Sequence, residues 1–227
     1  MAAEGNGFHS IVSVYIGILW FCIGHLRTDI VQDLLKRKFM MSLNRYPKEI
    51  VLKDGSEIIL KPLAQDAQNA LLAFFKELPI ENRWYLKEDP TDPAVIQKWA
   101  DNQELGKTFC VLAWHNDKVV AHASLLRWLR GGRKHLGRLR LMVATDYRQK
   151  QLGTWLIFDM IRRAMELGLE KLRTDFIIGL EDMAINAVKK LDFVSEGMLK
   201  DYFRDDDGNY YDYQIMVKQL HSEWSDF

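Results

Sequence analysis

The residues best suited to bind an anionic ligand form a short basic and polar turn that includes Arg148 and Lys150 and ends at Gly153. Apolar residues alternate before the turn and recur every three or four positions after it, which predicts a strand, a turn and an amphipathic helix. A helix start presents unpaired backbone N–H groups and the positive end of the helix dipole. The sequence therefore predicts a phosphate or pyrophosphate site at the start of this helix.

Residues 143–157, V-A-T-D-Y-R-Q-K-Q-L-G-T-W-L-I, resemble the acetyl-CoA-binding signature of the GNAT acetyltransferase superfamily. The family pattern is Arg or Gln, two residues, Gly, one residue, then Gly or Ala. Arg148 and Gly153 fit this pattern, whereas Gln151 stands where the first Gly is usual. The resemblance covers residues 57–220 and includes the helix, strand, hairpin and strand that close the family's fold.

The resemblance implies that acetyl-CoA is the co-substrate, and no metal site is expected. The strand end would pair with the pantetheine arm, and the backbone of the turn would hold the pyrophosphate. The implied cofactor-binding residues are Met142, Val143, Ala144, Arg148, Gln149, Lys150, Gln151, Leu152, Gly153 and Thr154. The residues alone leave another interpretation open, in which Val143 is an ordinary core residue and Arg148 and Lys150 are surface charges.

The usual catalytic groups of this family are missing from their expected positions. Many relatives carry a Glu on the central strand as a base, but the outward positions here are Arg138 and Arg140. The Tyr that often protonates the thiolate corresponds to Val188, and an Asn that often binds the cofactor corresponds to Glu181. The catalytic residues are therefore unknown, and the candidates are Tyr202, Asp175 and Tyr85.

The resemblance implies an N-acetyltransferase that moves an acetyl group to a primary amine by direct attack. The amine could belong to a protein amino terminus, a lysine or a small molecule. The alternative is a non-catalytic acyl-CoA-binding regulatory or interaction module of the same fold. The acceptor side is predicted at residues 79–93 and 128–137, and the basic second segment hints at an acidic feature in the acceptor. Within the first segment, Glu81, Arg83, Trp84 and Tyr85 are candidates for substrate contact, or form a solvated loop pinned by Trp84.

The composition is that of a globular protein with 227 residues, 48% of them hydrophobic and 27% charged. Basic and acidic residues both number 31, so the net charge is zero, which argues against a nucleic-acid partner. The two cysteines make neither a disulfide framework nor a zinc site. Cys110 lies in a predicted strand, and we expect it to be a buried structural residue rather than a nucleophile.

The predicted fold is α/β (α+β), with a mixed, mostly antiparallel central sheet flanked by helices and preceded by an N-terminal apolar helix. A hairpin is predicted over residues 50–63, with its turn at Asp54 and Gly55. The remaining predicted strands cover residues 108–114, 118–127, 138–143, 171–178, 193–199 and 210–220. The predicted helices cover residues 64–78, 94–102, 152–167 and 181–190.

Three parts of the chain are distinguished: an apolar segment and linker (residues 1–46), the acetyltransferase domain (47–220) and a tail (221–227). The apolar segment could be a membrane anchor, a helix packed on the domain or a dispensable leader. We expect a cytoplasmic protein, with membrane attachment through residues 7–26 as the alternative. The oligomeric state stays open between monomer and homodimer.

Overall fold

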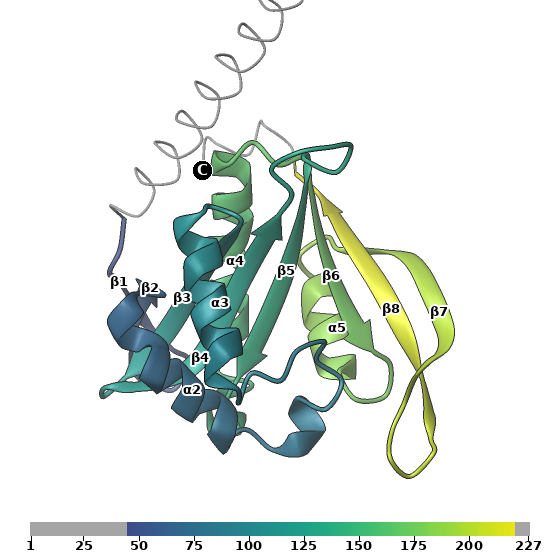
Figure 1. Cartoon of the computed structure of the whole chain (residues 1–227), viewed down its shortest axis with the longest axis horizontal. Coiled ribbons are helices and arrows are strands. Elements are labelled where there is room, and N and C mark those ends of the chain that lie inside the picture. Colours follow the sequence, from purple (N-terminus) through teal and green to yellow (C-terminus); the bar gives the residue numbers. More distant parts are fainter. Residues whose placement is uncertain (1–44, 221–227) are drawn as a thin grey trace, which may run out of the picture. The chain divides into compact units, whose positions relative to one another are not determined.

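The computed structural model describes residues 45–220, which form eight strands and four α-helices (Figure 1). The strands are β1 (Lys48–Val51), β2 (Glu57–Pro62), β3 (Thr108–His115), β4 (Lys118–Arg127), β5 (Leu136–Val143), β6 (Lys171–Ile177), β7 (Val194–Arg204) and β8 (Tyr210–Gln219). The α-helices are α2 (Gln68–Glu77), α3 (Pro93–Glu104), α4 (Leu152–Glu166) and α5 (Asp182–Lys189), and the 3-10 turns are η1 (Gln65–Ala67), η2 (Ile80–Asn82) and η3 (Thr145–Tyr147).

All eight strands belong to one sheet with the order β1-β2-β3-β4-β5-β6-β8-β7. Every neighbouring pair is antiparallel except β5 and β6, which are parallel. The prediction of a mixed, mostly antiparallel sheet flanked by helices is therefore confirmed. The predicted N-terminal apolar helix and the tail lie outside the described residues.

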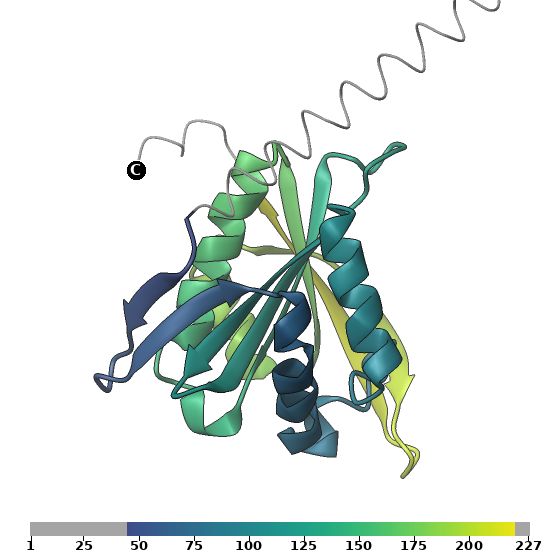
Figure 2. The same ribbon diagram turned by 60° about the vertical axis from the view of Figure 1, so that its left-hand side comes forward.

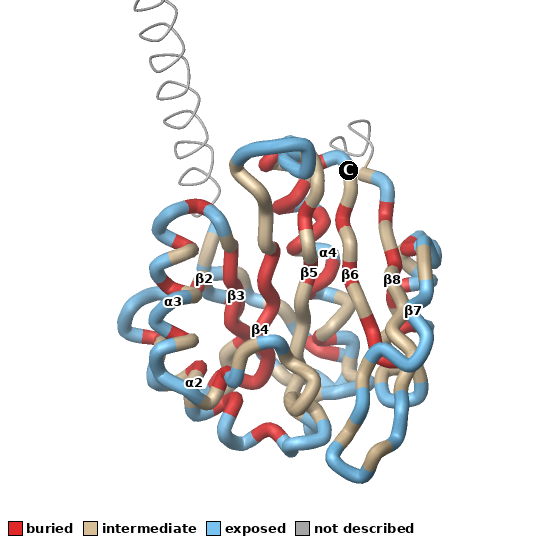
Figure 3. The backbone as a smooth tube through the Cα atoms, turned by 45° about the vertical axis from the view of Figure 1, so that its right-hand side comes forward, coloured by how far each residue is buried: buried red, intermediate tan, exposed pale blue. Residues whose placement is uncertain are grey.

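Helices cover both faces of the sheet, with α2 and α3 on one face and α4 and α5 on the other (Figure 2). The central strands are therefore buried on both sides, which explains why the β4 sequence is almost continuously apolar rather than alternating. Buried residues concentrate in β3 and β4, whereas the edge strand β7 is mostly exposed (Figure 3).

The side chains of β5 divide between these two layers. Met142 packs against the apolar cluster formed by α2, α3 and their neighbours. Leu141 and Val143 point the other way, because they are the side chains nearest to Gly153 at the start of α4. Since side chains alternate along a strand, Arg138 and Arg140 share the α2/α3 face with Met142.

Local sequence signals set the ends of the elements. α3 begins where the Asp92 side chain accepts a hydrogen bond of 2.8 Å from the backbone N–H of Ala94, with a proline in the first turn. α4 ends at Glu166, and Gly168, two residues further on, has a left-handed φ of +71°. The turn at Asp54 and Gly55 joins β1 to β2, as predicted.

The edge strand β7 extends beyond the predicted end at residue 199 and reaches Arg204. Its pairing with β8 shifts register twice, between Ser195 and Gly197 and between Leu199 and Phe203. Such bulges break the regular alternation that sequence analysis relies on, so the second half of this strand gives a weak signal.

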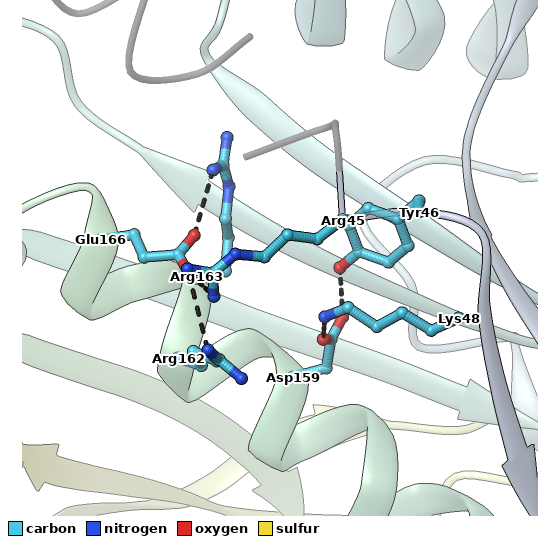
Figure 4. A pocket seen from close by; sticks show the side chains of 7 residues that line it. All are labelled: Arg45, Tyr46, Lys48, Asp159, Arg162, Arg163 and Glu166. Carbon is cyan, nitrogen blue, oxygen red and sulfur yellow. Dashed lines mark hydrogen bonds and ion pairs between the residues drawn. The ribbon is translucent and has the colours of Figure 1, made fainter. Parts of the chain in front are cut away.

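A polar cluster fixes the start of β1 to helix α4 (Figure 4). The carboxylate of Asp159 accepts hydrogen bonds from the Tyr46 hydroxyl and the Lys48 ammonium group. Beside it, Arg45 and Glu166 form an ion pair of 2.7 Å. Burial and the neighbouring carboxylate of Asp159 raise the pKa of Tyr46. Residues just before the predicted start of the domain therefore already contact its core helix.

Within residues 45–220, no helix combines the length and apolar character needed to cross a membrane. Residues 7–26, the segment for which membrane attachment is an alternative, lie outside this range.

Candidate active site

The two parallel strands at the centre of the sheet separate partway along their length. β5 and β6 pair at three positions, the last of which joins Arg138 to Arg173. Beyond this point β5 continues to Val143 and β6 to Ile177, and the strands diverge (Figure 1). β5 stays paired with β4 on its other edge as far as Val143. The last part of β5 thus has one open edge whose peptide groups face no neighbouring strand.

The open edge exposes the peptide groups of alternate residues. The backbone N–H of Ala144 donates to the carbonyl oxygen of Val120 at 2.9 Å, so Ala144 faces β4. Peptide groups alternate in direction along a strand, so Met142 also faces β4, whereas Leu141 and Val143 face the open edge. Of the three residues predicted to pair with the pantetheine arm, only Val143 is oriented to do so, and Leu141 is an addition.

The turn after β5 has the backbone conformation expected of an anion site. Gln149 and Gln151 adopt left-handed φ values of +61° and +70°. The backbone N–H of Trp155 donates to the carbonyl of Gln151, so the N–H groups of the three preceding residues, 152–154, come before the first full helical turn. Successive free N–H groups at a helix start form a concave, electropositive surface.

The basic side chains of the turn contact other parts of the protein. The Arg148 guanidinium donates to the Val143 carbonyl at 3.1 Å and to the Asn82 side chain at 2.8 Å. Lys150 forms an ion pair of 2.8 Å with Asp54. A ligand that uses Arg148 would therefore have to replace its contacts with the strand end and with the loop before α3.

Gly153 lies against the sheet rather than at the open surface of the turn. A Cβ atom at this position would be 3.5 Å from Leu141 and 3.9 Å from Val143, which is ordinary contact. A small side chain would fit here, but a bulky one would push the start of α4 away from β5.

Asp175, one of the three catalytic candidates, is buried between two arginines. Its carboxylate forms an ion pair of 2.7 Å with Arg138 and a second one with Arg173. Arg138 also donates to the Tyr213 hydroxyl at 2.9 Å, and burial raises the pKa of Tyr213 to about 12. The charge of Asp175 is thus compensated by two guanidinium groups, and its carboxylate is engaged in ion pairs.

Tyr85, the second candidate, donates a hydrogen bond of 3.1 Å to Glu181. The other oxygen of Glu181 accepts from the backbone N–H of Ile177 at 2.8 Å, at the end of β6. Burial raises the pKa of Glu181, and burial together with this carboxylate raises that of Tyr85. The pair ties the loop before α3 to the diverging end of β6. Val188, at the position of the usual thiolate acid, is buried in the core.

The third candidate, Tyr202, is exposed and stacks on Tyr213 with ring centroids 5.2 Å apart. It borders a group of aromatic side chains that connects the loop before α3 to β7 and β8. We call this group the aromatic ledge, and its members are Trp84, Tyr85, Phe203, Tyr211 and Tyr213. Trp84 therefore pins its loop to the sheet, as one of the two predicted interpretations required.

The two loops assigned to the acceptor side lie at different places. The loop before α3 adjoins the diverging ends of β5 and β6 through Tyr85 and Glu181. The basic connection of residues 128–135 precedes β5 and lies at the opposite end, where β5 and β6 are paired. His135 there accepts a hydrogen bond from the backbone N–H of Glu170, directly before β6. The sequence alone could not show that these two loops lie at opposite ends of β5.

Two further buried side chains, Cys110 and His122, lie outside these networks. Cys110 is buried, and burial raises its pKa to about 12, so its thiol is unsuited to be a nucleophile. His122 on β4 was missed, although a polar residue in an apolar strand is a visible signal. Its ring stacks on Trp99 at 5.3 Å and touches Phe75 edge-on, and neither ring nitrogen has a hydrogen-bond partner among the described residues.

Among residues 45–220, no group of three or more His, Cys, Asp or Glu side chains could hold a metal ion.

A strand, a tight turn and an amphipathic helix follow one another at this site, as the resemblance to acetyltransferases implies. The family model described as Acetyltransferase (GNAT) family matches residues 71–193, more than half of the chain. The protein therefore belongs to the GNAT acetyltransferase family, whose members are acetyl-CoA-dependent acyltransferases.

Solved structures share this fold at low sequence identity. The N-acetyltransferase from Staphylococcus aureus Mu50 has a TM-score of 0.65 at 15% identity, covering 72% of this chain and 99% of its own. The ribosomal-protein-alanine N-acetyltransferase from Brucella melitensis has a TM-score of 0.62 at 22% identity, with coverage of 71% and 99%. The putative acetyltransferase yncA from Salmonella typhimurium, solved with its cofactor acetyl-CoA, has a TM-score of 0.63 at 17% identity, with coverage of 72% and 94%. No curated protein matches the sequence.

Proposed function

We propose that this protein transfers the acetyl group of acetyl-CoA to a primary amine by direct attack of the amine on the thioester. The observation that carries the proposal is the open edge of β5, which leads without interruption into the turn with free N–H groups at the start of α4. A pantetheine arm can pair with such an edge as a peptide strand would, and the helix start suits a pyrophosphate.

In the proposed reaction, the C–N bond forms as the C–S bond of the thioester breaks. The amine loses a proton, and the CoA thiolate gains one. The peptide groups of Leu141 and Val143 would hold the arm, and the N–H groups of residues 152–154 would hold the pyrophosphate. The buried thiol of Cys110 takes no part, in keeping with direct transfer and no acyl-enzyme intermediate.

Positioning is the main catalytic contribution in this proposal. Asp175 is held between two arginines, and Tyr85 is hydrogen-bonded to a buried carboxylate, so both side chains are engaged in contacts within the protein. Fixing the amine beside the thioester can remove roughly 7–11 kcal/mol of the barrier in favourable cases. Because the Brucella melitensis relative is named a ribosomal-protein-alanine N-acetyltransferase, we include peptides with an amino-terminal alanine among the acceptor amines to test.

The first experiment is calorimetric titration of the full chain with acetyl-CoA, CoA and ATP. We expect acetyl-CoA and CoA to bind and to raise the melting temperature, because a ligand that binds only the folded state stabilises it. ATP, which has phosphates but no pantetheine arm, should bind much more weakly. Equal binding of all three would mean that only the anion site is present.

Turnover is then measured with peptides bearing free amino termini, lysine peptides and small amines, following release of free CoA. Formation of an acetylated amine and CoA in equal amounts would support the proposal. Binding of acetyl-CoA without turnover on any amine would favour the alternative function, a non-catalytic acyl-CoA-binding module.

A further inference from the structure

Arg140 lies on β5 beside the open edge, in the part of the strand that no longer pairs with β6. It shares the α2/α3 face of the strand with Met142, whereas the start of α4 packs on the opposite face through Leu141. It immediately precedes Leu141, whose peptide group faces the open edge. Its side chain is therefore close to the expected thioester, but on the far side of the sheet from the helix start that suits the pyrophosphate.

The positive charge of Arg140 has no partner within residues 45–220. No ion pair or hydrogen bond of its side chain is formed there, although the residue is partly buried. The two carboxylates that influence it are already engaged. Asp175 pairs with Arg138 and Arg173, and Glu88 forms an ion pair with Lys98.

The surroundings of Arg140 favour the binding of an anion at this point. Burial and the neighbouring positive charge of Arg138 lower the pKa of Arg140. Arg138 is itself held in place by Asp175 and by the hydroxyl of Tyr213. Desolvating a guanidinium group without an anion is unfavourable, and perturbed charges of this kind concentrate in functional sites.

We propose that Arg140 binds an anionic group on the acceptor, so that the natural substrate is an amine that also carries a carboxylate or a phosphate. This inference rests on the proposed function for the identity of the reaction, but the binding of the anion does not depend on turnover. A guanidinium group offers two parallel N–H donors, which match a carboxylate or phosphate in a bidentate contact. Tyr213, a member of the aromatic ledge, accepts a hydrogen bond from Arg138 and contacts Phe203 of β7, which in turn contacts Trp84 and Tyr85 in the loop before α3, so an acceptor body could lie beside it.

The test compares amines that differ only in the anion. Omega-amino carboxylates of several chain lengths are paired with their amides, and O-phosphoethanolamine is paired with ethanolamine. Each compound is measured for kcat/KM with acetyl-CoA and for binding by calorimetry in the presence of CoA. The proteins are the wild type, Arg140→Met, Arg140→Lys and, as a control, Lys134→Met, which removes an exposed positive charge at the other end of β5.

We expect the wild type to show a kcat/KM or an affinity about tenfold or more higher for at least one anionic compound than for its neutral partner. A factor of this size is typical of a hydrogen bond between charged groups. Arg140→Met should bring this ratio close to one, Arg140→Lys should lower it partially, and Lys134→Met should leave it unchanged. The carboxylate and phosphate series show which anion is preferred. If Arg140→Met does not fold, Arg140→Gln replaces it, and the wild-type comparison stands by itself.

The outcomes separate this inference from the proposed function. Absence of turnover on every amine, together with Arg140-dependent binding of the anionic compounds, would refute the transferase and keep the anion site. Turnover or binding with no preference for anionic compounds in the wild type would overturn the anion site. A preference that survives in Arg140→Met, or that Lys134→Met removes equally, would overturn it as well.

Discussion

Arg138 and Asp175 form an ion pair of 2.7 Å at the point where β5 and β6 stop pairing. The residue directly opposite Arg138 on β6 is Arg173, so two positive charges face each other across the last paired position. Like charges at such a position are unfavourable. The carboxylate of Asp175 contacts both guanidinium groups and so stabilises the place where the strands begin to diverge.

We therefore expect Asp175→Asn to lower the free energy of unfolding by about 3 kcal/mol, because it leaves two partly buried arginines without their anion. Urea unfolding measures this change. The double variant Arg138→Met/Asp175→Leu should recover most of the loss, since an apolar pair can replace a buried ion pair. A loss below about 1 kcal/mol for Asp175→Asn would show that solvent compensates these charges.

Gln151→Gly should raise the stability of the protein. Gln151 has a φ of +70°, in the region where a residue with a Cβ is about 1–2 kcal/mol less favourable than glycine. Part of this gain is offset by the greater freedom of glycine in the unfolded chain. We expect a net gain of about 0.5–1 kcal/mol in thermal or urea unfolding.

The matched control is Gln151→Ala, which keeps the Cβ and removes only the rest of the side chain. It should not stabilise the protein, because the unfavourable φ persists. If Gln151→Gly and Gln151→Ala change the stability equally, the effect comes from the loss of the Gln151 side chain and not from its φ. The backbone that holds the proposed pyrophosphate is unchanged in both, so acetyl-CoA affinity should stay within about threefold of the wild type, less than 1 kcal/mol.

His122→Phe should make the protein less sensitive to acid. Burial, assisted by the charge of Arg140, lowers the pKa of His122 from 6.5 to about 3. Below pH 6.5 the unfolded chain therefore binds a proton that the folded protein does not, and the stability of the wild type falls as the pH falls toward 3. At pH 5 this single group costs the wild type about 2 kcal/mol relative to pH 7 or above.

The comparison is urea unfolding of both proteins at pH 7.5 and pH 5. His122→Phe keeps a flat ring between Trp99 and Phe75 and removes two unpaired nitrogen atoms, so it should be at least as stable as the wild type at pH 7.5. Its advantage should grow at pH 5. The same loss of stability between the two pH values in both proteins would show that His122 is protonated in the folded state.

Tyr85→Phe tests whether this residue positions the loop before α3 or acts as an acid. The substitution removes the hydrogen bond to Glu181 and should lower the free energy of unfolding by about 1 kcal/mol. Because the pKa of Tyr85 is raised, we expect kcat to fall by less than tenfold. A fall of about 100-fold or more, with unchanged KM, would identify Tyr85 as the acid that protonates the thiolate.

The elements of this fold could be predicted closely from the sequence. All eight strands and all four α-helices of residues 45–220 were predicted, with ends mostly within a few residues. These features depend on local patterns: the spacing of apolar residues, a proline after Asp92, and a glycine at residue 168. The turn proposed to bind an anion was found in the same way, because a strand, a polar turn and an amphipathic helix follow one another directly.

The site itself was predictable only in part. The sequence indicated the turn and named Tyr85 and Asp175, but it could not show that Asp175 is held by Arg138 or that Tyr85 is held by Glu181. It also assigned the basic connection before β5 to the acceptor side, whereas the fold places it at the opposite end of the strand.

The sequence by itself thus determined which segments become strands and helices, and the family to which their order belongs. Only the tertiary structure decided which edge of β5 is open, where Arg148 and Asn82 meet, and that Arg140 has no partner within residues 45–220. The physical reason is that helices and turns form from contacts between near neighbours. Strand pairing and buried charge networks join residues far apart in the chain, and the order of the strands in the sheet fixes those partners.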